Sequence, residues 1–341
     1  MNYNKFINNR SYSRFMNYKI TTIALGMALF ASVAGVTQAA SIGPAQQYNP
    51  QINPADFTTN ITNPYFTLPV GKKMVYEAKT PDGLERIEIV VPGWTKTVMG
   101  VETLVYWDRV YLNGVIKEDT RDYLAQHKNG DLWYFGEHVD DYVNGKFKDH
   151  HGAWVAGENG ARPGIWMLAN PQVGDEFRNE YYAKEAEDIS KIVSVTETVT
   201  VPQGTFTGCV KTFDWTPLDP KTANKYWCKQ VGGTALEVEL ISGDRKVAER
   251  SELIQTDLKG ALGIALPAAY AKDGIVDPSA KANGGASVSG KDQGGKGYGK
   301  EADGNEQGEG ADWLSIIISG LVGLGLGVVL QKFVLNKHIF K

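Results

Sequence analysis

The chain has little cysteine and no concentrated positive charge. Only two of its 341 residues are cysteines, Cys209 and Cys228. Neither lies near the end of the leader, which excludes an acylated N-terminal cysteine as a membrane anchor. The net charge at pH 7 is −4, and no block of Lys and Arg in the exported part is longer than a pair. A nucleic-acid-binding surface is therefore not expected. Proteins, lipids and small molecules are the expected partners.

The short motifs of several enzyme classes are also absent. The sequence has no Gly-x-Ser-x-Gly elbow, no phosphate loop, no His-Glu-x-x-His and no dinucleotide fingerprint ahead of a helix. No stretch between the two ends of the chain has the spacing of a long amphipathic helix. These absences make catalysis the less favoured interpretation, and no cofactor is expected.

Two apolar stretches near the chain ends predict where the protein is located. Ile20–Gly35 follows a basic lead and is followed by Ala39 and Ala40, which is typical of a cleavable signal peptide over residues 1–40. Trp313–Leu330 would be about 27 Å long as a helix, close to the thickness of the bilayer core. We expect a single-pass anchor over 313–335 and a cytoplasmic tail over 336–341, because lysines follow the apolar stretch. The middle of the chain is then periplasmic or extracellular.

One face of the predicted anchor carries small residues at every fourth position: Ser315, Ser319, Gly323 and Gly327. Stripes of this kind let two membrane helices approach closely, which indicates a homodimer. The alternative is that the stripe only reflects the high glycine content of the segment.

The exported part has the sequence of an antiparallel β domain. Asp82-Gly83, Asn113-Gly114, Asn129-Gly130 and Asn144-Gly145 are typical hairpin turns. The intervening runs are rich in β-branched and aromatic residues. They predict about nine strands, at 86–91, 102–112, 115–124, 131–135, 190–201, 205–215, 225–230, 236–242 and 246–254. The predicted fold class is mainly β, with a single curved antiparallel sheet or open barrel over 41–258.

A Gly-rich stretch separates this domain from the anchor. Ala282–Gly310 has almost no large apolar residue, so it cannot offset the entropy cost of ordering. We expect a flexible stalk over 259–312. The short apolar run Ala261–Ala269 is too brief to span a bilayer, and the two alternatives are that it caps the β domain or lies on the lipid surface.

The two cysteines belong to one predicted hairpin. A turn near Leu218 and Asp219 places Cys209 opposite Cys228 on neighbouring strands. Directly opposed strand residues are within disulfide range, and an oxidising compartment favours the bond. The alternative is a pair of buried free thiols.

The densest polar cluster includes Glu137, His138, His150 and His151. Imidazole and carboxylate groups bind zinc and similar ions, and the Asn144-Gly145 turn could fold the two ends together. Their spacing matches no established ligand pattern, however, and adjacent strand residues point to opposite faces. The favoured interpretation is an exposed polar loop.

The glycine-rich stretch 152–164 supplies the candidate ligand-lining residues. Trp154 and Trp166 would line the mouth of a β cavity, where Arg162 could hold an anionic group. The alternative is a covering loop whose tryptophans fill the space against the sheet.

Two groups of residues carry a resemblance to a known family. The first runs from Tyr134-Phe135-Gly136-Glu137 through His151-Gly152-Ala153-Trp154 to Pro163-Gly164, and the second includes Val201-Pro202-Gln203-Gly204-Thr205-Phe206, Cys209 and Thr216-Pro217-Leu218. The chain resembles an uncharacterised family of exported bacterial β-rich proteins. That family implies no activity and no catalytic residues. The strand pattern is also loosely similar to the half-barrels of periplasmic lipoprotein carriers.

Three functions follow as hypotheses. The first is a non-catalytic, membrane-tethered extracytoplasmic β module that binds an apolar small molecule, a lipid or an envelope protein. The second is a structural or surface-display protein without a ligand. The third is a metal-dependent enzyme that uses the cluster from Glu137 to His151.

Overall fold

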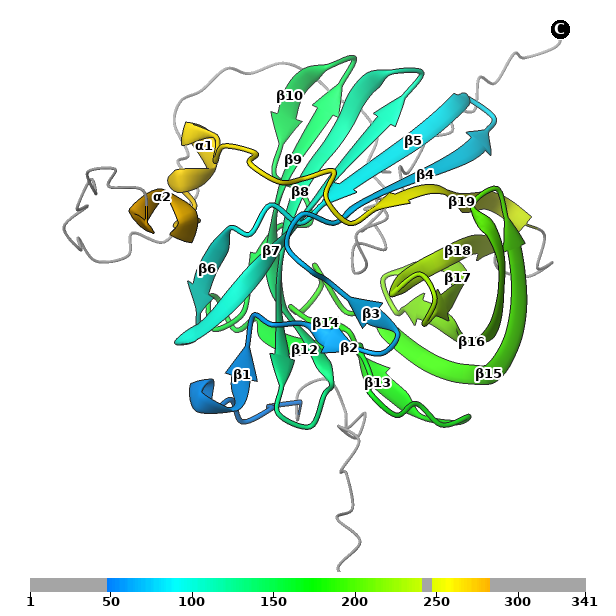
Figure 1. Ribbon diagram of the computed structural model, residues 1–341, viewed down its shortest axis with the longest axis horizontal. Helices are drawn as coiled ribbons and strands as arrows, with labels where there is room; N and C mark the ends of the chain where they lie inside the picture. Colours follow the sequence, from blue (N-terminus) through cyan, green and yellow to red (C-terminus); the bar gives the residue numbers. More distant parts are fainter. Residues whose placement is uncertain (1–47, 241–246, 283–341) are drawn as a thin grey trace, which may run out of the picture. The chain divides into compact units, whose positions relative to one another are not determined.

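The computed structural model describes residues 48–240 and 247–282. In this part of the chain, 17 strands form one sheet and two short strands form a second. All strand pairings in the large sheet are antiparallel. The fold is mainly β, as predicted (Figure 1).

The first half of the large sheet is a series of long hairpins. Each strand pairs with the next long strand in the chain, so that their side chains alternate between two common faces. The strands are β4 (Lys73–Thr80), β5 (Gly83–Val90), β7 (Val101–Leu112), β8 (Val115–His127) and β9 (Leu132–Val143).

The predicted turns differ in geometry. Asn113 and Gly114 have φ angles of 50° and 79°, and Asn144 and Gly145 have 52° and 73°, as expected of a two-residue hairpin turn with positive φ at both positions. At the other two predicted turns only the glycine has a positive φ. The Asn-Gly pairs at 113 and 144 therefore set the hairpins β7–β8 and β9–β10 (β10, Lys146–Asp149).

The second half of the sheet repeats the same construction. Its strands pair in chain order, and the last pairs with β4, which joins the two halves. They are β15 (Ile189–Val201), β16 (Gly204–Thr216), β17 (Asp219–Cys228), β18 (Gly233–Leu240) and β19 (Val247–Asp257).

One predicted strand boundary requires correction. The second cysteine-bearing strand is predicted at 225–230, yet β17 begins at Asp219 and has Pro220 as its second residue. The pairing shifts there, from Trp215 opposite Thr222 to Thr216 opposite Asp219. Pro220 therefore lies in a bulge, where its missing N–H interrupts no regular ladder hydrogen bond.

A short seam brings the two halves together on their other side. β12 (Arg162–Met167) pairs with β9 and, at Arg162 and Pro163, with β14 (Glu180–Tyr181). β13 (Glu176–Arg178) precedes β14 by one residue and pairs with β15. The pairings thus return to their start, and the sheet is a nearly closed antiparallel barrel, which confirms the predicted curved sheet or open barrel in its coarse form.

Short elements complete the described chain. Its fold has nineteen strands, more than the predicted nine. Most of the others are short and lack the long periodic runs that sequence patterns detect, although the eight-residue β4 is also absent from the prediction. The short elements are the 3₁₀ helix Pro54–Asp56, β1 (Phe57–Thr58), β2 (Thr62–Asn63), β3 (Phe66–Thr67), β6 (Thr95–Val98), β11 (Trp154–Val155), α1 (Ala268–Ala271) and α2 (Pro278–Ala282).

Residues 258–277, here called the C-terminal strap, pack against the sheet. Ala261, Tyr270 and Ile275 are buried, and Thr95 and Val276 exchange backbone hydrogen bonds of 2.9 and 2.8 Å. In Figure 1 the yellow segment leads from β19 to α1. The strap includes residue 259, where the stalk is predicted to begin, and its apolar residues are divided between these buried ones and exposed ones such as Leu262 and Val276.

Other sequence predictions fall on residues outside the described part. These are the signal peptide 1–40, the remainder of the stalk, the anchor 313–335 with its stripe Ser315, Ser319, Gly323 and Gly327, and the tail 336–341. Among the described residues, no helix is both long enough and apolar enough to cross a bilayer.

Candidate functional site

The inner face of the barrel carries an unusual number of carboxylates. On β8, Glu118, Thr120, Asp122 and Leu124 share one face because alternate strand residues point the same way. We define the inner acidic cluster as ten carboxylates, each 8% exposed or less. They are Glu85, Asp108, Glu118, Asp122, Glu137, Glu180, Asp188, Asp214, Glu237 and Glu239.

Acids on neighbouring strands stand directly opposite each other. Asp122 on β8 pairs in register with Glu137 on β9, and Glu239 on β18 pairs with Glu249 on β19. Directly opposed like charges destabilise a sheet. These pairs therefore require shared protons or an added cation.

Gly136, the residue before Glu137 on β9, allows a neighbouring strand to come unusually close. Its φ is +125°, and a Cβ there would lie 2.4 Å from the carbonyl oxygen of Trp154. Only glycine allows β11 to approach β9 so closely. The residue after it, Glu137, is fully buried at 0% exposure.

The two halves of the barrel contribute to the same interior. Asp108 of β7 and Glu237 of β18 both raise the pKa of Tyr76, whose burial is the largest cause of its raised pKa. The same two carboxylates also raise the pKa of Tyr106, again after burial. Acids that are far apart in the sequence therefore act on common neighbours inside the barrel.

Cations are scarce around the cluster. Of the four buried lysines and arginines among the described residues, only Lys225 lies within 4 Å of a cluster carboxylate. Its Nζ is 3.6 Å from Oε1 of Glu237 and 3.9 Å from Oδ2 of Asp214. The partly exposed Lys221 adds a contact of 3.2 Å to Glu239. Two lysines cannot neutralise ten carboxylates.

Several cluster oxygens have no hydrogen-bond partner in the described chain. Both carboxylate oxygens of Asp108 are buried and have no hydrogen-bond partner among the described residues, whereas Glu137 lies near the hydroxyl of Tyr134 and Glu180 near the indole N–H of Trp154. By contrast, Oδ1 of Asp122 accepts a hydrogen bond of 2.7 Å from the hydroxyl of Tyr134. An unpaired buried carboxylate is costly unless it is protonated or a cation joins it.

The titration of the cluster follows from burial and like charge. Burial raises the pKa of Asp122 to about 7 and that of Glu118 to about 7. Burial also raises the pKa of Glu237 to about 8, although Lys225 acts in the opposite direction. Burial, followed by the charge of Glu249, raises the pKa of Glu85 to about 9. Several carboxylates of the cluster therefore change their protonation state near neutral pH.

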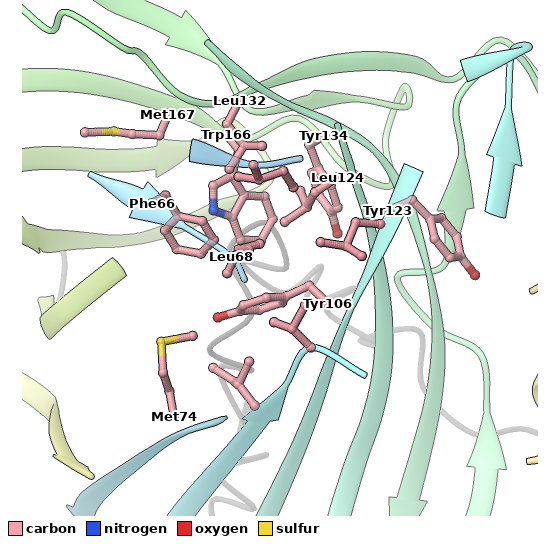
Figure 2. Packing of buried hydrophobic residues seen from close by; sticks show 14 of the residues in the cluster. Phe66, Leu68, Met74, Tyr106, Tyr123, Leu124, Leu132, Tyr134, Trp166 and Met167 are labelled. Carbon is pink, nitrogen blue, oxygen red and sulfur yellow. The ribbon is translucent and has the colours of Figure 1, made fainter. Parts of the chain in front are cut away.

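One end of the interior is filled with aromatic side chains instead. Trp166 is 0% exposed, and its ring centroid lies 4.8 Å from Tyr134, 5.6 Å from Phe66 and 5.8 Å from Tyr106. Figure 2 shows the indole of Trp166 among these rings, with Tyr123 pointing away from them. Trp154 packs on Tyr134 at 5.1 Å. The structure thus places both predicted ligand-lining tryptophans within the core.

Lys72 stabilises this aromatic end through hydrogen bonds. Its Nζ donates hydrogen bonds to the carbonyl oxygens of Thr67, Val231 and Gly232 at 2.8, 3.1 and 2.7 Å. Burial lowers its pKa to about 8. The side chain joins β3 to the turn between β17 and β18, so Phe66 is held inside the barrel.

Arg162, the third predicted lining residue, lies at the seam. It is partly exposed and stands opposite Tyr181 in the pairing of β12 with β14. Its guanidinium carbon is 5.8 Å from the centre of the Tyr181 ring.

The candidate metal residues lie on different faces. Glu137 points inward, whereas Nδ1 of its neighbour His138 is 2.6 Å from the hydroxyl of Tyr123 on the outer face. Nδ1 of His150 is 2.8 Å from the carbonyl oxygen of Val139 and 2.9 Å from Oδ1 of Asp140. The predicted exposed loop is wrong for Glu137 and His138, because β9 extends to Val143. The backbone N–H of His151 donates to Oδ1 of Asp149 at 3.2 Å.

The described residues contain no group of three or more His, Cys, Asp or Glu side chains placed to hold a metal ion. The acids of the inner cluster come from strands between β5 and β18 and from the segment just before β15. This distribution suits separated positive charges better than a single ion.

The predicted disulfide is present. Cys209 and Cys228 are bonded, with their Cα atoms 4.4 Å apart, and both are fully buried. The bond joins β16 to β17 one pair beyond the register pair Val210 and Trp227.

Sequence reasoning identified only Glu137 among the cluster residues. Eight of the remaining nine lie in strands, where charged residues are typical of solvent-facing positions, and Asp188 lies just before β15. The one sequence feature that points to them is the charged run Lys117–Asp122 within a long central strand, between neighbours rich in aromatic residues.

No protein-family model matches this chain, and no curated protein matches it. A crystal structure of MucB in complex with MucA(peri) overlaps 61% of this chain and 57% of its own, with a TM-score of 0.26 and 10% identity. The MucA/MucB complex of Pseudomonas aeruginosa overlaps 58% and 53%, with a TM-score of 0.23 and 10% identity. MucB alone overlaps 62% and 57%, with a TM-score of 0.25 and 8% identity. The chain thus spans less than two thirds of these MucB chains, and at such scores the likeness does not extend to function.

Proposed function

We propose that this protein is an exported, non-catalytic binding module whose barrel interior binds an organic cation, such as a diamine or polyamine. One observation carries the proposal: both carboxylate oxygens of Asp108 are buried, unpaired and surrounded by further acids. Burial, followed by the charges of Asp122 and Glu118, raises the pKa of Asp108 well above its usual range. A cation that enters the interior would remove this cost.

The distribution of the acids supports an organic cation over a metal ion. Metal ions need several ligand atoms at one point, at about 2.0 to 2.6 Å. The inner acidic cluster instead extends around the barrel wall from β5 to β18, and its described members form no metal-binding group. A flexible amine with two or more separated charges can contact several acids at once.

The aromatic end argues against the apolar ligand predicted from the sequence. Trp154 and Trp166 are 3% and 0% exposed, and each packs against Tyr134. An apolar guest there would have to displace core side chains. Among the described residues, the acidic end has carboxylate oxygens without a partner, whereas the unpaired groups of the aromatic end are indole N–H donors such as those of Trp154 and Trp166, which would not attract an apolar molecule.

The setting of the module remains as the sequence predicts. We propose residues 1–40 as a signal peptide, a Gly-rich stalk beyond residue 282 and an anchor over 313–335, with the barrel on the outer side of the membrane and residues 336–341 inside. A tether would keep the binding module at the envelope.

Native mass spectrometry of the full-length protein at pH 8 tests the proposal. We expect a stoichiometric adduct with spermidine in the wild type and in Glu102→Gln, a variant of an exposed carboxylate on the same strand as Asp108. The adduct should be lost in the double variant Asp108→Asn, Glu137→Gln. A calcium or zinc adduct that resists spermidine, or a neutral apolar molecule that copurifies, would contradict the proposed ligand class. A protein that takes up none of these ligands would indicate the display function instead.

A further inference from the structure

A pair of arginines lies at the seam of the barrel. Arg162 begins β12 and Arg178 ends β13, and both side chains approach the ring of Tyr181 on β14. The guanidinium carbon of Arg162 is 5.8 Å from the Tyr181 ring centre, and that of Arg178 is 5.4 Å from it. Two cations thus share one aromatic ring.

Within residues 48–240 and 247–282, neither arginine has an anionic partner. The described residues supply no hydrogen bond and no carboxylate within 4 Å to either guanidinium, although Arg178 is only 5% exposed. Nε and Nη1 of Arg178 and Nη1 of Arg162 are buried and unpaired. Removing one member of a buried ion pair is strongly destabilising, so a buried arginine without its anion is an incomplete site.

Tyr48 closes the seam over both arginines. Its hydroxyl donates a hydrogen bond of 2.8 Å to the carbonyl oxygen of Pro163, and its ring lies 5.9 Å from the guanidinium carbon of Arg178. Burial raises the pKa of Tyr48, and the charges of Arg178 and then Arg162 act against that rise. Both cations are therefore close to the Tyr48 hydroxyl.

We infer that this seam binds a phosphate group through Arg162 and Arg178. Both guanidiniums stay charged at any physiological pH, and their planar arrays of N–H donors match the oxygens of phosphate. Two full positive charges are best balanced by a phosphomonoester or inorganic phosphate, which carries a charge of about −1.5 to −2 at pH 7. Partly exposed Arg162 provides the approach from solvent, while Tyr48 and Tyr181 hold the two side chains in place.

This site does not depend on the proposed function, although Glu180 of the inner acidic cluster is the neighbour of Tyr181 on β14. The arginines carry positive charge at the seam, whereas the cluster carries negative charge inside the barrel. Variants of one site should leave binding at the other unchanged, so the two claims can fail independently.

Isothermal titration of the full-length protein with inorganic phosphate at pH 7 tests the inference. We expect saturable binding that weakens at least about tenfold in Arg162→Gln, since a hydrogen bond to a charged group contributes roughly 1.5 to 3 kcal/mol. Arg250→Gln, at an exposed arginine on β19, serves as the control and should bind as the wild type does. Arg162→Lys should recover only part of the affinity, because lysine lacks the planar array. If Arg178→Gln fails to fold, Arg162→Gln still decides the question, since Arg162 is partly exposed.

Two further ligands identify the source of the phosphate. Binding to phosphatidic acid vesicles but not to phosphatidylcholine vesicles, with loss in Arg162→Gln, would support a lipid phosphomonoester headgroup as the source. Acetate that binds as tightly as phosphate would overturn the assignment to phosphate. Phosphate affinity that is unchanged in both arginine variants, or no binding of phosphate or vesicles at all, would overturn the site itself.

Discussion

Single buried charges determine the chemistry of this barrel. Asp108 is 1% exposed and has no partner, so its ionised form is strongly disfavoured. Lys72 is equally buried but directs its ammonium at three carbonyl oxygens. The contrast separates the two roles: Lys72 completes a structural contact, whereas Asp108 leaves bonding capacity unused.

Asp108→Asn should therefore stabilise the unliganded protein relative to the wild type, and by more at pH 8 than at pH 6.5. The variant removes a group whose folded pKa is raised, and that group lowers stability more as the pH rises. Denaturant unfolding of variant and wild type at the two pH values measures this difference. A variant that is less stable than the wild type by the same amount at both pH values would show that Asp108 serves only in packing.

The elements of the fold were more predictable than the faces they bury. All nine predicted strand runs coincide with strands, because turn residues such as Asn113-Gly114 mark where each ends. On β18, however, Leu236 and Glu237 are 4% and 5% exposed, so both faces are buried. An alternation of apolar and charged residues gives two faces but does not say which one is inside.

Most of the candidate site could not be predicted from the sequence, for a related reason. The inner acidic cluster gathers residues from β5 to β18, and only the closing pairs of the barrel bring them together. Trp154 and Trp166 were recognisable as large residues near a glycine-rich loop, but the insertion of Phe66 from β3, which fills the space beside Trp166, could not be foreseen. The disulfide was predictable because both of its cysteines belong to one local hairpin.

The disulfide between β16 and β17 should contribute substantially to stability. The bonded residues are 19 apart in sequence, and the chain-entropy model gives roughly 3 kcal/mol for a loop of this size. The double variant Cys209→Ser, Cys228→Ser should lose about that much free energy of unfolding. Denaturant titration under oxidising conditions measures the loss, and a wild type that loses nothing when reduced would contradict the prediction.

The C-terminal strap should depend on Tyr270. Its hydroxyl donates a hydrogen bond of 2.6 Å to Oδ2 of Asp119, and its ring packs against Trp94, Trp107 and the guanidinium of Arg121. Tyr270→Ala should cost about 3 to 5 kcal/mol, in the range of other large aromatic truncations. Limited trypsin digestion should then cut at Lys272 or Lys259 much faster than in the wild type.

Tyr270→Phe provides the matched control for the strap. It keeps the ring contacts and removes only the hydrogen bond, so we expect a loss of about 1 to 3 kcal/mol, as for a hydrogen bond to a charged group. Equal protection of the strap in Tyr270→Ala and the wild type would show that the backbone pair of Thr95 and Val276 holds the segment alone.

The barrel as a whole should lose stability as the pH rises through neutrality. Groups whose folded pKa is raised, such as Asp122 and Glu118 at about 7 and Glu237 at about 8, stabilise the fold while they are protonated. Their unfolded pKa values are near 4, so their contribution is complete at low pH and is lost as the pH passes their folded values.

The window from pH 6.5 to pH 8 isolates this effect. Burial lowers the pKa of His138 to about 3. Its contribution to stability therefore increases with pH up to about 6.5 and is constant above that pH. Burial lowers the pKa of Lys72 to about 8. Its contribution to stability therefore increases with pH only once the pH exceeds about 8. We expect the free energy of unfolding to fall by at least about 2 kcal/mol across the window. A flat or rising stability profile would mean that the acids are already neutralised by protein groups.

The central claim is that the inner acidic cluster binds an organic cation, and calorimetric titration of the full-length protein with spermidine at pH 6 and pH 8 tests it most directly. The account predicts saturable binding that is tighter at pH 8, because more cluster carboxylates are ionised there, and that is weakened at least about tenfold by Asp108→Asn but not by Glu102→Gln. Binding that is absent at both pH values, or equally strong in Asp108→Asn, would contradict the claim.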